Sequence, residues 1–258
     1  MNGDVLQPAG PRAGVRFDTT HWSVVRRAGA AAAGSPEDAR AAMGGLVETY
    51  WYPLYAFARR RGHADHDAMD LTQGFFAHLM GGDALGSVSP EKGRFRSFLL
   101  AAFTNYMSNQ RRAAGARRRG GAATVLPLHP AGGADGFSDR YAHEPADHET
   151  PERLFERSFV EALLARVRAR LAGDYAAAGR AELFALLEPH LLHRPDAAPR
   201  AEVGRRLGLS PAAVNMSLHR VRRRYGELLR EEVALTVDDP ADVDAEIREL
   251  LAIVARAG

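Results

Sequence analysis

Histidine and aspartate residues that could bind a metal ion gather in one short stretch of the chain. They are His63, Asp65, His66, Asp67 and Asp70. His66 and Asp70 are four residues apart, the spacing that places two ligands on one face of a helix. A polar helix start has the same composition, and we favour this second interpretation. The sequence has no glycine-rich nucleotide loop, serine nucleophile elbow or zincin motif. We therefore expect no enzyme, no catalytic residue, no metal and no cofactor.

A second stretch, residues 200–225, has the residue types of a DNA-reading unit. It reads RAEVGRRLGLSPAAVNMSLHRVRRRY. Gly208 can end a short first helix, while Ser210 and Pro211 can cap and begin a second one. This pattern is typical of a helix-turn-helix. The alternative is an amphipathic helical hairpin with a solvated charged face.

The second helix of this unit separates apolar from polar residues. Its inward stripe is Val214, Leu218, Val221 and Tyr225. The opposite face begins with small and polar side chains and ends in arginines, which suits a helix that enters a major groove by its N-terminus. The residues expected to contact DNA are Ser210, Ala212, Ala213, Asn215, Met216, His219, Arg220, Arg222 and Arg223.

Composition narrows the class of protein. The chain has 258 residues, of which 46% are hydrophobic, enough for one large or two small packed domains. It has no cysteine, which excludes a disulfide scaffold and a thiolate zinc site and fits a reducing cytoplasm. It has no apolar run of signal-peptide or membrane-span type, so we expect a cytoplasmic protein without a membrane partner. The net charge is only +2, so the distribution of charge matters more than its sum.

Helical periodicity accounts for every segment with a clear pattern. No segment shows a convincing strand, so the sequence predicts an all-α fold with two helical domains joined by a flexible linker, the second containing the helix-turn-helix. The stretch 17–25, FDTTHWSVV, should begin the ordered structure. The expected helices start at Pro36 (with Pro53 as a kink or re-start) and at about 65–80, 95–112, 151–171, 176–192, 201–207 and 211–230, with a loop at 81–94.

The helix expected at 95–112 carries residue types that bind single-stranded DNA. Tyr106 could stack on an unpaired base, although its position on the apolar face favours a core role equally well. The arginines that follow could neutralise phosphates, or they could simply begin a solvated linker. The candidate residues are Asn105, Tyr106, Ser108, Asn109, Arg111, Arg112, Arg117, Arg118 and Arg119.

Several stretches, in this order and spacing, strongly resemble RNA polymerase sigma factors of the extracytoplasmic-function (ECF) class. They are YWYPLYAFARRRG, DHDAMDLTQGFFAHLM, GRFRSFLLAAFTNYMSNQRRAAGARRR and AEVGRRLGLSPAAVNMSLHRVRRRYGELLR. The first three are similar to the family's second region and the fourth to its fourth region. The opening FDTTHWSVV and the acidic close resemble one sub-branch of the class.

The resemblance implies the domains and their partners. Residues 1–16 would be a flexible leader, 17–119 a region 2-like domain, 120–150 a linker, 151–232 a region 4-like domain and 233–258 an acidic C-terminal extension. Region 2 would dock on the clamp helices of core RNA polymerase and open the promoter at the minus-ten element, and region 4 would hold the minus-thirty-five element. The implied polymerase-binding residues are Asp67, Asp70, Gln73, Gly74 and Ala77. An anti-sigma factor is left open as a further partner.

Two questions stay open at the level of the sequence. A stand-alone helix-turn-helix regulator, which binds duplex DNA without polymerase, is the alternative function. The acidic extension could also fold back and compete with DNA for the arginines at 220–224. Departures from the family pattern include Asn215 and Ser217, where related recognition helices often carry basic residues.

Overall fold

The computed structural model describes residues 36–80, 94–117, 140–142, 149–191, 197–237 and 239–257. These residues are almost all helical and contain no strand, which confirms the predicted all-α fold. None of the helices described is long and apolar enough to cross a membrane. The expected leader, the ordered start at 17–25, most of the loop at 81–94 and most of the linker at 120–150 lie outside the described residues.

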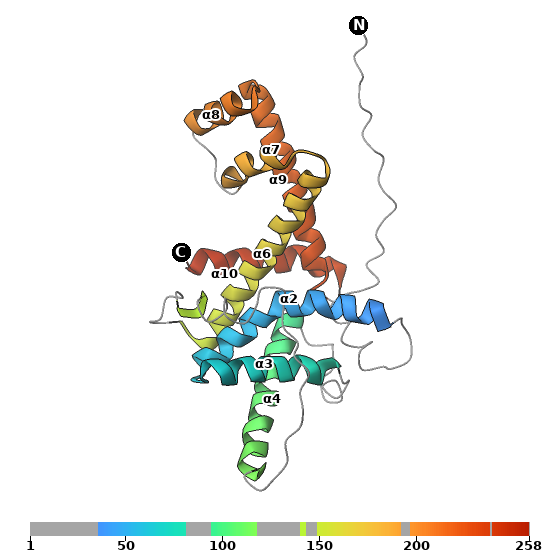
Figure 1. The fold of residues 1–258 in the computed structure, drawn as a ribbon, viewed down its shortest axis with the longest axis vertical. Coiled ribbons are helices and arrows are strands. Elements are labelled where there is room, and N and C mark those ends of the chain that lie inside the picture. Colours follow the sequence, from blue (N-terminus) through green and yellow to red (C-terminus); the bar gives the residue numbers. More distant parts are fainter. Residues whose placement is uncertain are drawn as a thin grey trace.

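Helices follow one another along the described chain (Figure 1). They are α2 (Pro36–Arg60), α3 (Asp65–Met80), α4 (Phe95–Arg117), α6 (Pro151–Ala177), α7 (Ala181–Leu187), the short 3₁₀ helix η3 (Glu188–His190), α8 (Ala197–Leu207), α9 (Pro211–Ala234), the 3₁₀ helix η4 (Pro240–Asp242) and α10 (Val243–Ala257).

Helices α2, α3 and α4 pack through aromatic side chains. The predicted inward stripe of α3 is buried or half-buried along its whole length, from Ala68 to Leu79. Trp51 of α2 stacks on Phe76 of α3 with ring centroids 5.7 Å apart, and Phe75 lies 5.1 Å from Phe103 of α4. Burial of such large rings contributes most of the stability of a small helical unit.

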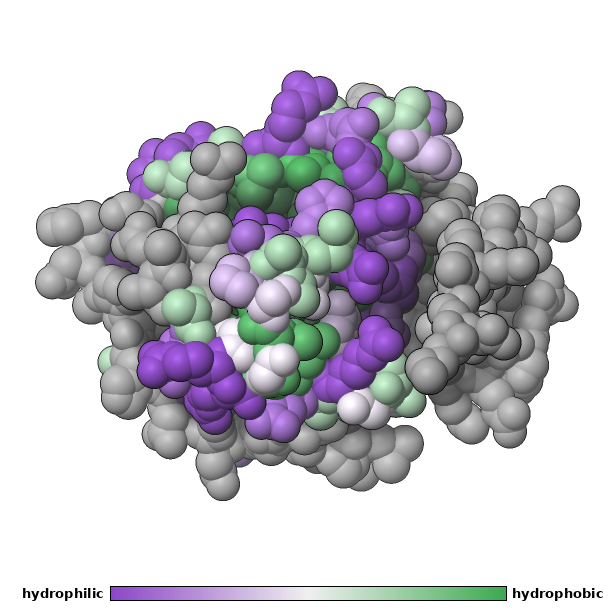
Figure 2. All heavy atoms as spheres, turned by 90° about the horizontal axis from the view of Figure 1, so that it is seen from above, coloured by the Kyte–Doolittle hydropathy of each residue, from purple (hydrophilic) through white to green (hydrophobic). Residues whose placement is uncertain are grey.

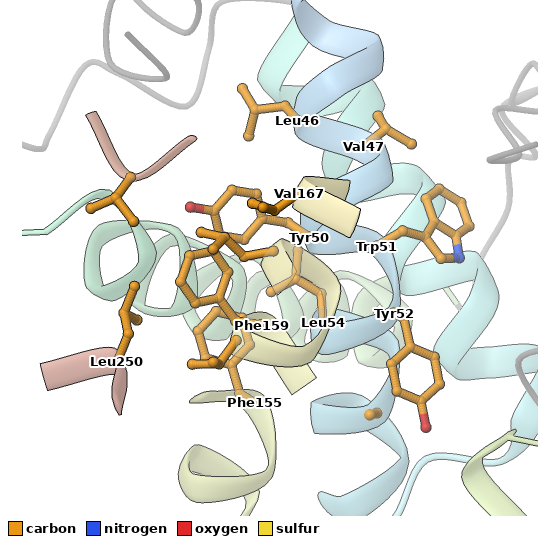
Figure 3. Packing of buried hydrophobic residues seen from close by; sticks show 14 of the residues in the cluster. Leu46, Val47, Tyr50, Trp51, Tyr52, Leu54, Phe155, Phe159, Val167 and Leu250 are labelled. Carbon is orange, nitrogen blue, oxygen red and sulfur yellow. The ribbon is translucent and has the colours of Figure 1, made fainter. Parts of the chain in front are cut away.

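Helix α6 joins this aromatic core although it follows the expected linker. Tyr50 of α2 stacks on Phe159 of α6 with centroids 5.0 Å apart, and Phe57 meets Phe155 edge-on at 6.5 Å. Figure 3 shows Tyr50, Leu54, Phe155 and Phe159 pointing toward one another between the two helices. The first half of the chain and α6 therefore share one hydrophobic core.

The predicted bounds of the helix at 176–192 are wrong. Helix α6 continues to Ala177, and Gly179 then takes φ +67°, a left-handed conformation that favours glycine. The amide of Arg180 donates to the carbonyl of Tyr175 at 2.8 Å, which closes the helix end. Helix α7 therefore starts only at Ala181 and gives way to η3 at Glu188.

Other helix limits agree better with the sequence. Thr150 caps α6 by accepting from the amide of Arg153 at 3.3 Å, and Pro151 is its first residue, as predicted. Helix α2 begins at Pro36 and runs through Pro53 without interruption. Helices α4, α8 and α9 each extend a few residues beyond the expected bounds.

The acidic C-terminal segment forms α10, which packs on both α6 and α9. Leu250 and Ile253 of α10 are buried in the common core, and Leu250 lies close to the α2–α6 contact in Figure 3. In Figure 1, α8 lies at one end of the long axis and the last turns of α4 project at the other. Helix α10 crosses between these ends.

Candidate nucleic-acid interface

The exposed side of α3 carries the residues expected to bind polymerase. Asp67 and Asp70 are exposed, whereas Gln73, Gly74 and Ala77 are half-buried. The Asp70 carboxylate lies beside the His66 imidazole, with Nδ1 and Oδ2 3.1 Å apart. An acidic, solvent-facing helix side that ends in small residues leaves room for another helix to pack against it.

Gly74 has a second role inside the protein. A Cβ atom at this position would overlap the hydroxyl oxygen of Tyr106 on α4. Tyr106 lies over α3, with its ring 5.7 Å from Phe75 and 5.5 Å from His78. Of the two roles expected for Tyr106, the packing role is therefore the one present in this conformation.

Two of the residues weighed as possible metal ligands, Asp65 and Asp70, have other partners. Asp65 pairs with Arg59 at 2.6 Å and accepts a hydrogen bond from the Tyr55 hydroxyl. Burial, together with the hydrogen bond to Asp65, raises the pKa of Tyr55 to about 12. Among the described residues, no group of three or more acidic or histidine side chains is placed to hold a metal ion.

The solvent-facing side of α4 carries the expected minus-ten residues. Asn105, Ser108, Asn109, Arg111 and Arg112 are all exposed. Their local bonds organise this side of the helix: Ser108 donates to the Thr104 carbonyl at 2.9 Å, and Arg112 donates to the Asn109 amide oxygen at 3.0 Å. The side chain of Arg117 and all of Arg118 and Arg119 lie outside the described residues.

A small hollow beside this strip was missed by the sequence analysis. It has a volume of about 50 Å³ and is lined by Arg61, His63, Thr104, Met107, Ser108 and Arg111. Arg61 directly follows α2, and its guanidinium also lies 5.4 Å from the Phe57 ring. Only the folded chain brings Arg61 and His63 next to Thr104 of α4, because about forty residues separate them in the sequence.

Helices α8 and α9 meet at a tight turn that depends on two glycines. Gly208 has φ +64°, and the Leu209 amide donates to the Gly204 carbonyl at 2.8 Å. A Cβ atom on Gly204 would lie 2.8 Å from the Leu209 carbonyl oxygen, closer than real Cβ atoms come. Ser210 caps α9 by accepting from the Ala213 amide at 3.2 Å.

The two faces of α9 are divided as the sequence predicted. Val214, Leu218 and Val221 are buried. The outer face is exposed at Ala212, Asn215, Met216, His219, Arg220 and Arg223, and Ala213 is half-buried. Met216 is 54% exposed and is the large apolar side chain on this face. The outer face of α9 is hence available to a partner over more than three turns.

Two arginines near the end of this face are half-buried and bind other parts of the protein. Arg222 donates to the backbone carbonyls of His190 at 2.8 Å and Leu191 at 3.0 Å, and so ties η3 to α9. Arg224 pairs with Asp174 of α6 at 2.9 Å. Arg223, by contrast, is 76% exposed and has a helical ion pair with Glu227 at 3.0 Å. Figure 2 views the molecule from the α8 end, where hydrophilic residues surround a smaller hydrophobic group.

The sequence suggested that the acidic extension could contact the arginines at 220–224, but the acids of α10 contact other arginines. Glu246 and Glu249 both pair with Arg94 and Arg96 at the start of α4, and the Arg96 Nη2 to Glu249 Oε1 distance is 2.6 Å. Asp244 pairs with Arg230. The proposed competition of these acids for the arginines at 220–224 therefore does not describe this conformation.

The comparison with protein families concerns the helices α2, α3 and α4. Residues 46–117, which span most of α2 together with α3 and α4, match the model of sigma-70 region 2. This stretch of the chain is similar to sigma-70 region 2. A search of curated proteins found no match, and a search of solved structures also found none.

This domain supports membership of the sigma factor family and indicates a role in RNA polymerase binding and promoter melting. Members of the family are transcription initiation factors without enzymatic activity. The partners implied by region 2 are core RNA polymerase and promoter DNA. The match includes α3 and α4, whose exposed sides carry the candidate residues described above.

Proposed function

We propose that this protein is an ECF-class sigma factor that directs core RNA polymerase to promoters with a minus-ten and a minus-thirty-five element. The observation that carries the proposal is the order of the two units: a region 2 domain is followed by the α8–α9 pair with an exposed, arginine-bearing face. The tight glycine turn and the Ser210 cap support a helix-turn-helix.

Helix α3 is the proposed polymerase contact. Asp67 and Asp70 would face the clamp helices, with Gln73 and Ala77 at the edge of the contact. Gly74 would lie at this contact without a side chain, and the same absence of a side chain makes room for the Tyr106 hydroxyl. Exposed acids of this kind contribute through charge complementarity and raise the association rate.

Helix α4 is the proposed minus-ten contact, and the neighbouring hollow extends it. Asn105 and Ser108 would meet bases, while Arg111 and Arg112 would neutralise phosphates. Arg61 and His63 add donors on the α2 side of the hollow, whose volume of about 50 Å³ suits a small polar group such as a backbone phosphate. The single DNA strand would then lie across α4 toward the end of α2.

Helix α9 is the proposed reader of the upstream element. Ala212, Asn215, Met216 and His219 would face base edges, and Arg220 and Arg223 the phosphates. Arg222 would act indirectly, by fixing η3 against α9. Because phosphate neutralisation provides much of the affinity, promoter binding should weaken steeply with salt.

Run-off transcription tests the proposal. Purified core polymerase is combined with this protein on sheared genomic DNA of the source organism, and new discrete transcripts are expected. Asp70→Ala should lower co-purification with core polymerase, whereas Glu182→Ala, which removes an exposed acid on α7, should leave it unchanged.

The stand-alone regulator makes the opposite prediction. Such a protein would bind duplex DNA by itself and would not retain core polymerase. Absence of transcripts together with absence of polymerase binding would therefore replace the sigma function by this alternative. The duplex-binding assay is run with and without core polymerase on the same fragments.

A further inference from the structure

The two arginines proposed to contact phosphates on the outer face of α9 differ in their ionic partners. Arg223 is 76% exposed, and its Nε lies 3.0 Å from Oε1 of Glu227. Arg220, about one turn earlier, is also exposed, but no carboxylate pairs with it among the residues that the structure describes. One of the two charges is therefore neutralised within the protein, and the other is not.

Glu227 continues the line of residues proposed to face DNA. The line consists of Ala212, Met216, His219, Arg223 and Glu227, at intervals of four, three, four and four residues. These intervals keep side chains on one side of a helix. At 1.5 Å per residue, Glu227 lies about 6 Å beyond Arg223 along the helix axis. A negative charge thus ends a line that otherwise carries neutral and positive side chains.

The Glu227 carboxylate contributes little to the stability of the fold. It is 44% exposed, and the order Arg before Glu is the less favourable one for two residues four apart on a helix. Its second oxygen lies 3.5 Å from Arg224, but Arg224 also pairs with Asp174 of α6 at 2.9 Å and with Glu231 at 3.5 Å. Neither contact makes an acid at this position necessary for folding.

We propose that Glu227 is a guard residue, which competes with DNA phosphates for Arg223 and so limits the binding of α9 to duplex DNA of any sequence. A phosphate that approaches Arg223 must displace the Glu227 carboxylate and is repelled by its charge. Met216, proposed to face bases, lies about 16 Å away along the helix, so base readout is left unchanged. The free protein is then less often bound to non-promoter DNA and stays available to core polymerase. This inference rests on the proposed role of α9.

Binding of the full-length protein to a fluorescent duplex of random sequence, without polymerase, tests the guard. In about 50 mM salt, Glu227→Gln should bind about threefold more tightly than wild type, because one more arginine is free to neutralise a phosphate. For the same reason, the logarithm of its affinity should fall more steeply with the logarithm of salt concentration, by about 0.9 in slope.

The matched control is Glu182→Gln on α7. It removes the same charge from an exposed acid that has no arginine partner in the described part of the chain, and it should bind the duplex as wild type does. Equal affinities of Glu227→Gln and Glu182→Gln would overturn the guard.

The two arginines show whether Glu227 acts through Arg223. Adding Glu227→Gln to Arg223→Gln should give no gain in affinity over Arg223→Gln alone, since the guarded arginine is absent. Adding it to Arg220→Gln should still give the gain of about threefold. An equal gain in both backgrounds would overturn direct competition, because it would show a general effect of the removed charge.

Two further results separate other causes. The melting temperature and helix content of Glu227→Gln should equal those of wild type, and a clear loss of either would assign Glu227 to the fold instead. If α9 does not bind DNA, Arg220→Gln and Arg223→Gln leave the duplex affinity unchanged, and the proposed upstream reader falls together with the guard. If both arginine variants weaken binding while Glu227→Gln does not strengthen it, only the guard falls.

Discussion

The region 2 helices and the α7–α9 unit are stabilised in different ways. Region 2 has large rings stacked in its core, such as Trp51 on Phe76 and Phe75 against Phe103. The α7–α9 unit has a smaller core of Phe184, Leu187, Val203, Val214 and Leu218, and its shape depends on glycines at the turn. Removal of apolar volume should therefore damage the first unit most, and backbone change the second.

The largest effect is expected from core truncation in region 2. Phe75→Ala should lower the free energy of unfolding by about 3–5 kcal/mol, because it leaves a cavity between α3 and α4. Val203→Ala in the smaller core should cost about 1–2 kcal/mol, since only two methyl groups leave. Chemical denaturation followed by circular dichroism measures both values. Because α6 contributes to the common core, a single transition is expected, and two separate transitions would contradict that shared core.

Replacing a glycine by alanine should destabilise the α7–α9 unit more than the region 2 helices. Gly204→Ala should cost about 1–3 kcal/mol, because its Cβ meets the Leu209 backbone carbonyl, which can move only with the turn. Gly74→Ala should cost less, since its Cβ meets only the end of the Tyr106 side chain. The melting temperatures of the two variants, each compared with that of the wild type, measure the two losses of stability. Combining Gly74→Ala with Tyr106→Phe should restore most of the loss, and a double variant no better than Gly74→Ala alone would refute the assigned contact.

Variants of two neighbouring arginines of α9 should have different effects, one on stability and the other on DNA binding. Arg222→Gln should lower the melting temperature by a few degrees, because it leaves the carbonyls of His190 and Leu191 without their donor, a loss of about 1–2 kcal/mol. Arg223→Gln should leave the melting temperature unchanged and weaken DNA binding on cognate and scrambled promoters alike. Asn215→Ala should instead change sequence preference. Equal effects of all three on both promoters would contradict this division of roles.

The smallest effect concerns alkaline pH. The pKa of Tyr55 is raised to about 12 in the folded protein, whereas an unfolded tyrosine titrates near 10. The unfolded chain therefore loses the proton first, and stability that is complete below pH 10 declines as the pH rises from about 10 to about 12. Tyr55→Phe should make this decline shallower in denaturation curves. A steeper decline in the variant would contradict the assigned origin.

The fold class and most helix limits could be predicted from local patterns. The inward stripes of α3 and α9, the caps at Thr150 and Ser210 and the first-turn prolines follow from side-chain spacing and backbone chemistry, which act within a few residues. The bounds near 176–192 were wrong because the left-handed turn at Gly179 interrupts an otherwise helical composition. The predicted division into two domains and the assigned site residues stay predictions.

Local sequence alone determined that the described chain is helical and which helix faces are buried, and it was enough to show the resemblance of residues 46–117 to sigma-70 region 2. Only the tertiary structure decided that Tyr106 packs over Gly74, that Arg222 binds η3, and that Arg61 and His63 adjoin α4. It also decided that Glu246 and Glu249 meet Arg94 and Arg96 across about 150 residues of chain. The physical reason is range: helix periodicity and capping depend on neighbours in sequence, whereas these contacts depend on how several helices are arranged around one core.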